Sequence, residues 1–273
     1  MKIKGQGHDM IQDIMEEKKP KISVVCPAYN AEHTIANAIN SILNQTFQDW
    51  ELIIIGDGGE NWQNQEKIVK SFNDPRIIYQ QQSHQGLVAA RNAGCRLAKA
   101  EIIAVQDADD LSMPDRLEKS YQLITDHDAD IVYHGWYVNM WDIKFNCIGR
   151  KYFPVRADKD YKIQDEILKS QCLPAWPIFR KWVWEQKPFR MKTQYAYDWM
   201  MWLDWLYGLQ IKMVGINTGL YEYVRHENSA SIRFEKEGLR QQSFQKIKEI
   251  MREEYGQTID ISDDAGLQPQ PSG

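Results

Sequence analysis

Short apolar runs alternate with stretches of helical apolar spacing over the first half of the chain. The runs predict strands at residues 22–26, 52–55, 77–79 and 102–105, and spacings of three to four predict helices over residues 35–43, 61–72 and 87–98. Strands that alternate with helices are typical of right-handed crossovers and a mainly parallel sheet covered on both faces. The pattern therefore predicts an α/β fold, whose ligands bind beyond the carboxyl ends of the strands.

The second half of the chain follows a different pattern. A helix over 114–126 and a strand at 131–133 precede a region that holds eight of the ten tryptophans. There we expect a hairpin over 136–152 that turns near 144–149, a helix over 198–207 and a strand over 220–224. The aromatic rings are interpreted either as core or as surfaces on which a sugar could stack.

These patterns divide the chain into four segments. Residues 1–20 form an N-terminal extension, 21–134 a first subdomain, and 135–255 a Trp-rich second subdomain of the same domain. The acidic stretch 256–273, rich in Gln, Pro and Ser, is expected to be a disordered tail.

Composition excludes several classes of protein. Lys and Arg number 33 against 38 Asp and Glu, a net charge of −5 without a basic run, which argues against a nucleic-acid partner. The four cysteines are far apart and form no CxxC pair, which favours neither a zinc site nor a disulfide framework. No run resembles a secretory signal or a membrane span. We expect a cytoplasmic protein, for which peripheral membrane contact stays open.

Polar residues follow three of the predicted strands. Pro27-Ala28-Tyr29-Asn30 follows the first, Gly56-Asp57-Gly58-Gly59 the second, and Asp107-Ala108-Asp109-Asp110 the fourth. Three carboxylates within four residues repel one another unless a cation or donor neutralises them, and hard oxygen ligands suit Mg²⁺ or Mn²⁺. The alternatives are a solvated acidic loop ahead of a helix and, for the glycines, an ordinary tight turn.

These motifs, with Ala90-Arg91-Asn92-Ala93-Gly94 between them, resemble the family 2 glycosyltransferases in order and spacing. The resemblance covers about residues 20–235 and implies a fold of the GT-A type. It further implies a nucleoside diphosphate-sugar donor and an acceptor hydroxyl, carried by a carbohydrate, a lipid-linked saccharide or another molecule.

The resemblance also implies the residues that bind the donor. Pro27, Tyr29, Glu32 and Asp57 would frame the nucleobase, although the family commonly has two consecutive aspartates where Gly56-Asp57 stands here. Arg91 would face the diphosphate or only pair with the acidic loop, and Asp107 would contribute to ribose or metal binding.

For metal binding and catalysis the resemblance implies three residues. Asp109 would be the direct ligand of Mn²⁺ or Mg²⁺, and His226 would close over the metal, unless it is a structural histidine. Asp198 would be the general base of inverting transfer, unless it only caps a helix. The family often has Glu before this aspartate, where Tyr197 stands here.

The sequence thus predicts a metal-dependent, inverting glycosyltransferase. Two alternatives stay open: a nucleotidyltransferase that makes a nucleotide sugar, and a non-catalytic carbohydrate-binding protein that uses the Trp-rich half. A dinucleotide-binding dehydrogenase is disfavoured because no GxGxxG follows the first strand.

Overall fold

A computed structural model of the 273-residue chain describes residues 19–141, 146–155, 173–191, 196–225 and 239–259. Its first half is the predicted alternation. Strands β1 (Ile22–Ala28), β2 (Trp50–Gly56), β3 (Ile77–Gln81) and β4 (Ile102–Val105) are parallel and lie in the order β3-β2-β1-β4. Helices α2 (Ile35–Leu43), α3 (Trp62–Ser71) and α4 (Leu87–Leu97) connect them.

The second half extends the same sheet with mixed strand directions. Next to β4 come β8 (Ile178–Arg180), β6 (Ile131–Trp141), β9 (Met213–Arg225) and β5 (Leu111–Ser112), with β6 parallel to β9 and the other contacts antiparallel. The predicted hairpin is confirmed, since β7 (Cys147–Phe153) pairs antiparallel with β6. The parallel arrangement thus holds for β1 to β4, and one sheet runs through both predicted subdomains.

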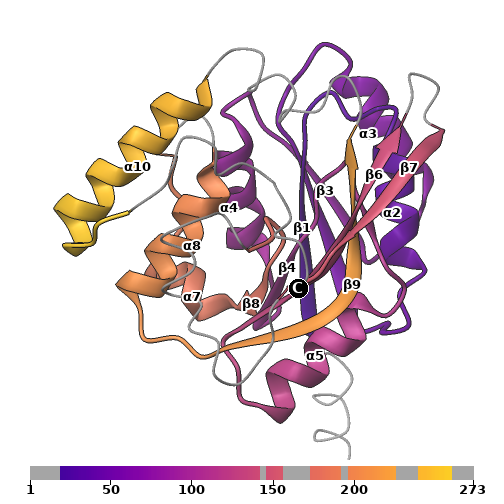
Figure 1. Cartoon of the computed structure of the whole chain (residues 1–273). Helices are drawn as coiled ribbons and strands as arrows, with labels where there is room; N and C mark the ends of the chain where they lie inside the picture. Colours follow the sequence, from indigo (N-terminus) through magenta and orange to yellow (C-terminus); the bar gives the residue numbers. More distant parts are fainter. Residues whose placement is uncertain (1–18, 142–145, 156–172, 192–195, 226–238, 260–273) are drawn as a thin grey trace, which may run out of the picture.

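Helices cover the sheet on two sides (Figure 1). Helices α4, α7 (Lys181–Gln186), α8 (Tyr197–Gly208) and α10 (Leu239–Tyr255) lie on one side, and α2, α3 and α5 (Arg116–Asp126) on the other. Because successive side chains of a strand point to opposite faces, Val25 and Ile53 join one core cluster while Val24 and Leu52 join the other. The continuous apolar runs of β1 and β2 are explained by burial on both faces.

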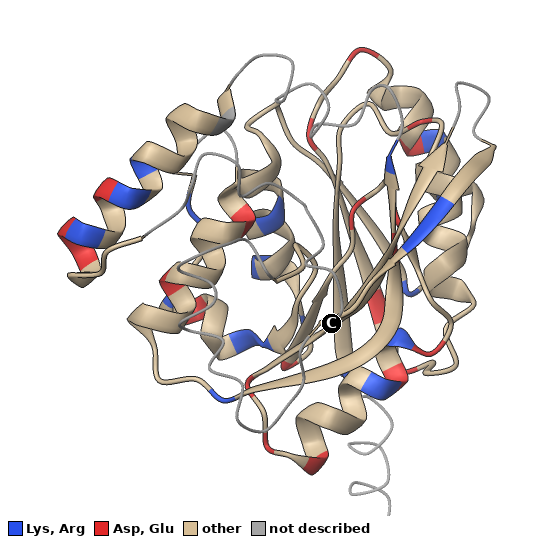
Figure 2. Ribbon diagram, viewed as in Figure 1, with Lys and Arg blue, Asp and Glu red and all other residues tan. Residues whose placement is uncertain are grey.

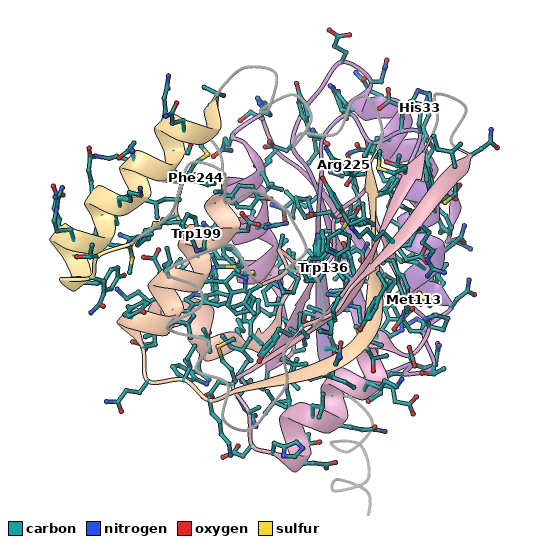
Figure 3. The ribbon with its side chains drawn as sticks, viewed as in Figure 1. His33, Met113, Trp136, Trp199, Arg225 and Phe244 are labelled. Carbon is teal, nitrogen blue, oxygen red and sulfur yellow. The ribbon has the colours of Figure 1, made fainter. Side chains whose placement is uncertain are left out.

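The second half packs through aromatic rings. Trp199, Trp202 and Trp205 of α8 are at most 1% exposed, which identifies them as core residues. Trp199 meets Phe244 of α10 edge to face at 5.4 Å (Figure 3). The sequence interpretation missed α10, although Phe244, Ile247 and Met251 recur at helical spacing and are buried. It also missed α7 and the two short strands β5 and β8.

The chain end differs in part from the expectation of a tail that begins at residue 256. Ile259 is only 5% exposed and packs into the core, and the Gln257 N–H donates to the Met251 carbonyl at 3.0 Å. Residues 256–259 therefore belong to the packed structure, whereas 260–273 lie outside the described residues.

Charged residues of both signs are interspersed over the elements, and α10 carries both (Figure 2). Among the helices of the described ranges, none has the length and apolar character needed to cross a bilayer.

Candidate active site

The carboxyl ends of β1, β2 and β4 meet at one edge of the sheet, as the sequence predicts. Ala28 pairs with Gly56, and Val25 pairs with Val105, so the loops that follow these strands begin side by side. Helix α4 packs directly on β1 because Gly94 leaves no side chain there; a Cβ at this position would lie 2.4 Å from Cγ1 of Val25. This close approach brings Arg91 to the same edge.

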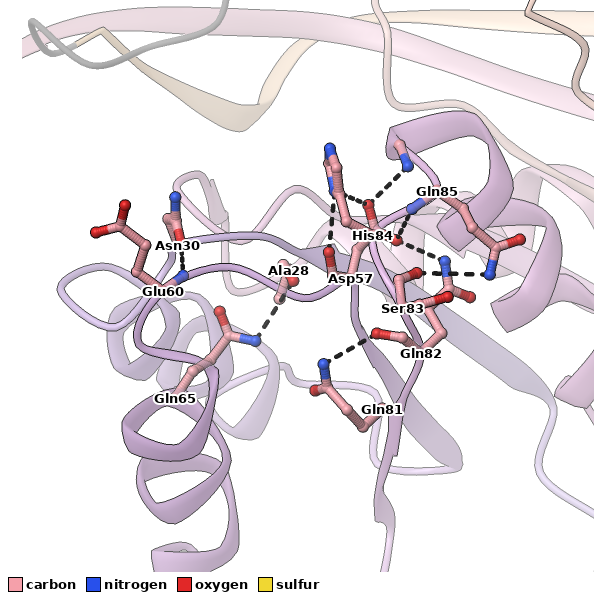
Figure 4. A network of polar contacts seen from close by, with 11 residues as sticks. Ala28, Asn30, Asp57, Glu60, Gln65, Gln81, Gln82, Ser83, His84 and Gln85 are labelled. Carbon is pink, nitrogen blue, oxygen red and sulfur yellow. Dashed lines mark hydrogen bonds and ion pairs between the residues drawn. The ribbon is translucent and has the colours of Figure 1, made fainter.

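Asp57, 2% exposed, has its carboxylate surrounded by donors from the segment 82–86 (Figure 4). Oδ1 accepts from the Gln82 side chain at 2.6 Å and from the Gln85 N–H at 2.9 Å. Oδ2 accepts from the Gly86 N–H at 2.8 Å and lies 2.9 Å from Nδ1 of His84. A carboxylate offers about four lone-pair sites, so Asp57 fixes the loop that leads into α4.

Of the predicted donor residues in and after β1, Tyr29 contacts this network through His84. Tyr29 is 46% exposed and stacks on His84 with ring centroids 4.4 Å apart. Pro27 is buried within β1, and Glu32 accepts a hydrogen bond from the Asn61 side chain at 2.9 Å. An exposed Tyr29 ring that rests on a second ring offers a flat surface to a planar ligand.

Gly56 stands where the family commonly has an aspartate, and the structure explains why a residue without a side chain is found at this position. A Cβ there would lie 2.2 Å from Oε1 of Gln81 and 2.3 Å from the hydroxyl oxygen of Tyr79. The Tyr79 hydroxyl donates to Gln81 Oε1 at 2.5 Å. A polar pair from β3 therefore fills the space that a side chain at position 56 would need.

Asp107 begins the acidic loop after β4 and has both carboxylate oxygens occupied. Oδ1 accepts from Nη2 of Arg91 at 2.6 Å, and Oδ2 accepts from the indole N–H of Trp176 at 2.8 Å. Its backbone N–H donates to the hydroxyl of Tyr221 at 2.9 Å. Residues from α4, the segment before β8 and β9 thus hold one carboxylate in place.

Arg91 connects this loop to the start of α8. Its side chain is 1% exposed, and its guanidinium carbon lies 5.2 Å from the ring centre of Tyr197. Burial acts to lower the pKa of Arg91, but the charge and hydrogen bond of Asp107 together with Tyr197 and Asp198 outweigh it, so the pKa is raised and the residue stays a cation. The electrostatic neighbours of this cation include Asp198 as well as Asp107. The predicted pairing of Arg91 with the acidic loop is confirmed.

The other two carboxylates of the loop differ in burial. Asp109 is partly exposed, whereas Asp110 is 1% exposed and accepts the Val224 N–H on Oδ1 at 2.8 Å. The second oxygen of Asp110 is buried and has no hydrogen-bond partner among the described residues. Burial, reinforced by the charges of Asp109 and Asp107, raises the pKa of Asp110 well above its usual value.

A second guanidinium group, that of Arg116, lies close to the acidic loop. Arg116 of α5 is fully buried and donates to the carbonyls of Val105 and Trp176 at 2.8 and 3.0 Å. Its Nε donates to His134, where burial followed by the charge of Arg116 lowers the pKa to about 3 and keeps the imidazole neutral. Burial lowers the pKa of Arg116 to about 10, so it remains a cation at neutral pH.

Asp198 lies in the first turn of α8 and is 9% exposed. The N-cap position belongs to Ala196, which adopts a left-handed conformation with φ of 58°. Burial raises the pKa of Asp198, and Arg91 opposes that effect in part. Asp204, the other acidic residue of α8, accepts from Arg190 Nε at 2.5 Å and from the Tyr255 hydroxyl at 2.9 Å, which joins α8 to α10.

The acidic loop fits a hard cation by its chemistry. Three carboxylates lie within four residues, Asp107 pairs with Arg91, and one buried oxygen of Asp110 has no hydrogen-bond partner among the described residues. Oxygen ligands of this kind suit Mg²⁺ or Mn²⁺. Within the described ranges no group of three or more His, Cys, Asp or Glu side chains is already arranged around a metal position. The predicted ligand His226 lies outside the described residues.

Comparison with known proteins identifies the family. The sequence profile of Glycosyl transferase family 2 matches residues 23–186, which is more than half of the chain. The chain belongs to glycosyl transferase family 2. The match spans the acidic loop, Arg91 and the loops after β1 and β2, and it ends before α8.

Relatives and solved structures agree with this family and with the fold. The chain is 29% identical over 228 residues to "Glycosyltransferase GlyA" of Streptococcus pneumoniae, covering 77% of this chain and 31% of GlyA. It therefore spans less than a third of that relative. The fold is similar to that of S. aureus TarS in complex with UDP, with a TM-score of 0.59, 18% identity, and 85% and 66% of the two chains covered.

The fold is also similar to that of a mannosyltransferase, PcManGT from Pyrobaculum calidifontis, solved in complex with GDP-Man and Mn²⁺. The TM-score is 0.59 at 14% identity, with 85% of this chain and 64% of that chain covered. The predicted fold of the GT-A type is confirmed by these similarities.

Four contributors to this family 2 site were not found from the sequence. They hold the predicted residues through side-chain contacts that no local pattern reveals: His84, Arg116, Trp176 and Tyr221. Trp176 carried a weak signal, since it lies in a loop rich in Trp and Pro that was considered for acceptor stacking.

Proposed function

We propose that the chain transfers a sugar from a nucleoside diphosphate-sugar to an acceptor hydroxyl with inversion at the anomeric carbon. The observation that carries this proposal is the position of Arg91, which pairs with Asp107 at 2.6 Å and has Asp198 among its electrostatic neighbours. One buried cation thus connects the acidic loop to the proposed base.

Asp198 acts as the general base. Its carboxylate takes the proton of the acceptor hydroxyl while that oxygen attacks the anomeric carbon from the face opposite the diphosphate. Burial raises the pKa of Asp198, which makes the carboxylate a better proton acceptor than an exposed aspartate. Tyr197, where the family often has Glu, packs against the Arg91 guanidinium and brings no second negative charge.

The acidic loop receives the diphosphate side of the donor. Asp109, the more exposed of the loop's last two aspartates, would hold Mn²⁺ or Mg²⁺ together with Asp107 and His226. When bound, the cation stabilises the negative charge of the leaving nucleoside diphosphate. PcManGT, of similar fold, was solved with Mn²⁺, which supports the proposal.

The nucleoside binds at the ends of β1 and β2. The Tyr29 ring stacks on the base, with Pro27 and Glu32 beside it, and Asp57 shapes the pocket through the segment 82–86 that it holds. The acceptor is a carbohydrate, a lipid-linked saccharide or another hydroxyl compound, and the proposed location is the cytoplasm.

The test is a panel of UDP-, GDP-, ADP- and dTDP-sugars with and without Mn²⁺, read first as thermal stabilisation and then as nucleoside diphosphate release. We expect at least one donor to stabilise the fold and to be slowly hydrolysed. Asp198→Asn should keep donor stabilisation but lower kcat by about 10² to 10⁴. The function is refuted by pyrophosphate release from a nucleoside triphosphate and a sugar 1-phosphate, or by binding of no donor at all.

The pH profile gives an independent check on Asp198. Only the deprotonated carboxylate accepts the proton, so kcat should fall as pH drops through its pKa. Because burial raises that pKa, the acid limb should lie above the usual range of an exposed aspartate, and it should disappear in Asp198→Asn.

A further inference from the structure

A hollow lies between α2 and the strands β5, β6 and β9, and its wall includes Leu111 and Ser112, which directly follow the acidic loop. Its volume is about 360 Å³, within the range of small-molecule sites. Met113 marks it in Figure 3. The residues that decide its chemistry come from α2 and from the sheet opposite: Asn37, Asn40, Asn44, Met113, Trp141 and Glu222.

One wall is a row of carboxamides on α2. Asn37, Asn40 and Asn44 follow i, i+3 and i+7 spacing and share one face of the helix. All three are exposed, and within the described part of the chain their side chains form no hydrogen bond. Asparagine is a poorer helix former than alanine, so Asn37 and Asn40 stand at positions within α2 where folding alone would favour other residues, whereas Asn44 is the C-cap of the helix.

The opposite wall offers a ring and a fixed carboxylate. Trp141 lines the hollow at the end of β6, and Glu222 lines it from β9. The orientation of Glu222 is set by Arg150 and by the side chain of Asn139, which donates to Oε2 at 3.0 Å. Arg150 is itself held, with its guanidinium carbon 3.8 Å from the ring centre of Tyr137.

The charged groups among the residues that line the hollow limit the classes of ligand that it can bind. None of the described residues that line it is Lys, Arg or His, and its one charged group, the carboxylate of Glu222, is already paired with Arg150, whose Nη2 also lies 3.9 Å from Sδ of Met113. A phosphate or nucleotide would need cationic donors. A sugar hydroxyl both donates and accepts, and each carboxamide offers both functions, while an indole ring covers an apolar face.

We propose that this hollow is an accessory site for one neutral saccharide unit, separate from the donor pocket. Strand β9 connects the two sites, because Tyr221 contacts Asp107 on one face while its neighbour Glu222 faces the hollow. The proposal that this unit is a remote part of the acceptor rests on the proposed glycosyl transfer, whereas the binding itself does not.

The test is saturation-transfer NMR on the full chain with glucose, galactose, mannose, rhamnose and N-acetylglucosamine. We expect a signal from at least one of them that persists with saturating UDP. Asn40→Leu and Trp141→Ala should weaken it at least five-fold, and Trp141→Phe should retain it. Asn64→Leu is the matched control, because Asn64 is an exposed asparagine on α3 outside the hollow.

Asn40→Leu keeps the test decisive even if the tryptophan variants misfold, because it changes an exposed helix position. The proposal is overturned if no saccharide gives a signal, if Asn40→Leu leaves the signal unchanged, or if UDP abolishes it. Donor binding, measured separately by thermal shift, tests the proposed transferase. Saccharide binding without donor binding would therefore refute the transferase alone.

Discussion

The loops after β2 and β4 both place carboxylates at the same edge of the sheet, yet they satisfy them in opposite ways. Asp57 is surrounded by donors of the segment 82–86, which occupy both of its oxygens. In the loop after β4, Asp107 accepts from Arg91 and Trp176, whereas one buried oxygen of Asp110 has no hydrogen-bond partner among the described residues.

The two loops differ in whether protein groups alone satisfy their carboxylates. They do so for Asp57 in the loop after β2, but not for Asp110 in the loop after β4. The carboxylate of Asp57 holds the backbone of the segment 82–86 in place, so we expect it to act on ligand binding through the shape of that segment. In the acidic loop, burial and the neighbouring charges of Asp109 and Asp107 raise the pKa of Asp110 well above its usual value, and a buried oxygen without a hydrogen bond is costly. We therefore expect the second loop to respond to cations and the first to be indifferent to them.

The largest expected effect is that of Asp109→Ala. Removal of the proposed metal ligand should lower turnover by about 10³-fold or more, on the order of 4 kcal/mol in the activation barrier. It should also abolish the dependence of donor binding on Mn²⁺. Nucleoside diphosphate release measures the turnover, and calorimetric titration of donor with and without Mn²⁺ measures the binding. Asp115→Ala serves as the control because Asp115 lies outside the acidic loop and pairs with Lys119. Full wild-type turnover in excess EDTA would contradict the assignment.

Arg91→Met should have the next largest effect, on stability. The variant leaves Asp107 without its buried cation, and breaking such a pair costs about 3 to 5 kcal/mol. We expect the lower end of that range because the Asp107 side chain is 20% exposed. Urea unfolding measures it, with Arg76→Met as the control for an ion pair of partly exposed side chains. If both variants lose the same free energy, the acidic loop does not depend on its buried cation.

Asp57→Ala tests the loop after β2, whose carboxylate has hydrogen bonds on both oxygens. It leaves the N–H groups of Gln85 and Gly86 unpaired, so nucleoside diphosphate binding should weaken by about 1 to 3 kcal/mol. The loss should be the same with and without Mn²⁺. Hydrogen exchange at the amides of Gln85 and Gly86 should accelerate in this variant. If exchange stays slow and the affinity for the nucleoside diphosphate is unchanged, Asp57 does not position this segment.

Tyr221→Phe should have the smallest effect. It keeps the ring but removes the hydroxyl that accepts the Asp107 N–H at 2.9 Å and that also hydrogen-bonds the Asp110 carboxyl, so stability should fall by about 1 to 2 kcal/mol. Tyr152→Phe is the control, since its hydroxyl donates to Asn217 at the surface and should be nearly neutral. A larger loss than that of Arg91→Met would show that neutral contacts, not cations, hold the acidic loop.

The sequence predicted the strands and the edge at which these residues meet, because buried parallel strands are continuous apolar runs and their motifs follow directly. It did not predict β5 and β8, which have two and three residues and so carry no readable period. It placed Asp57 and Asp107 at the site but not their partners, because Arg116 and Trp176 reach the acidic loop through tertiary packing. The N-cap position expected for Asp198 belongs to Ala196, but the Asp198 carboxylate still hydrogen-bonds backbone N–H groups of the first turn, including that of Trp199. Its role as the base therefore stays a prediction.

The packing at Gly56 bears on how this chain can change over evolutionary time. Tyr79 and Gln81 occupy the volume that an acidic side chain at position 56 would require. A side chain at position 56 therefore fits only if this pair moves, which the flexible Gln81 side chain can do more readily than the Tyr79 ring. We expect related sequences with a larger residue at position 56 to differ at positions 79 and 81 as well.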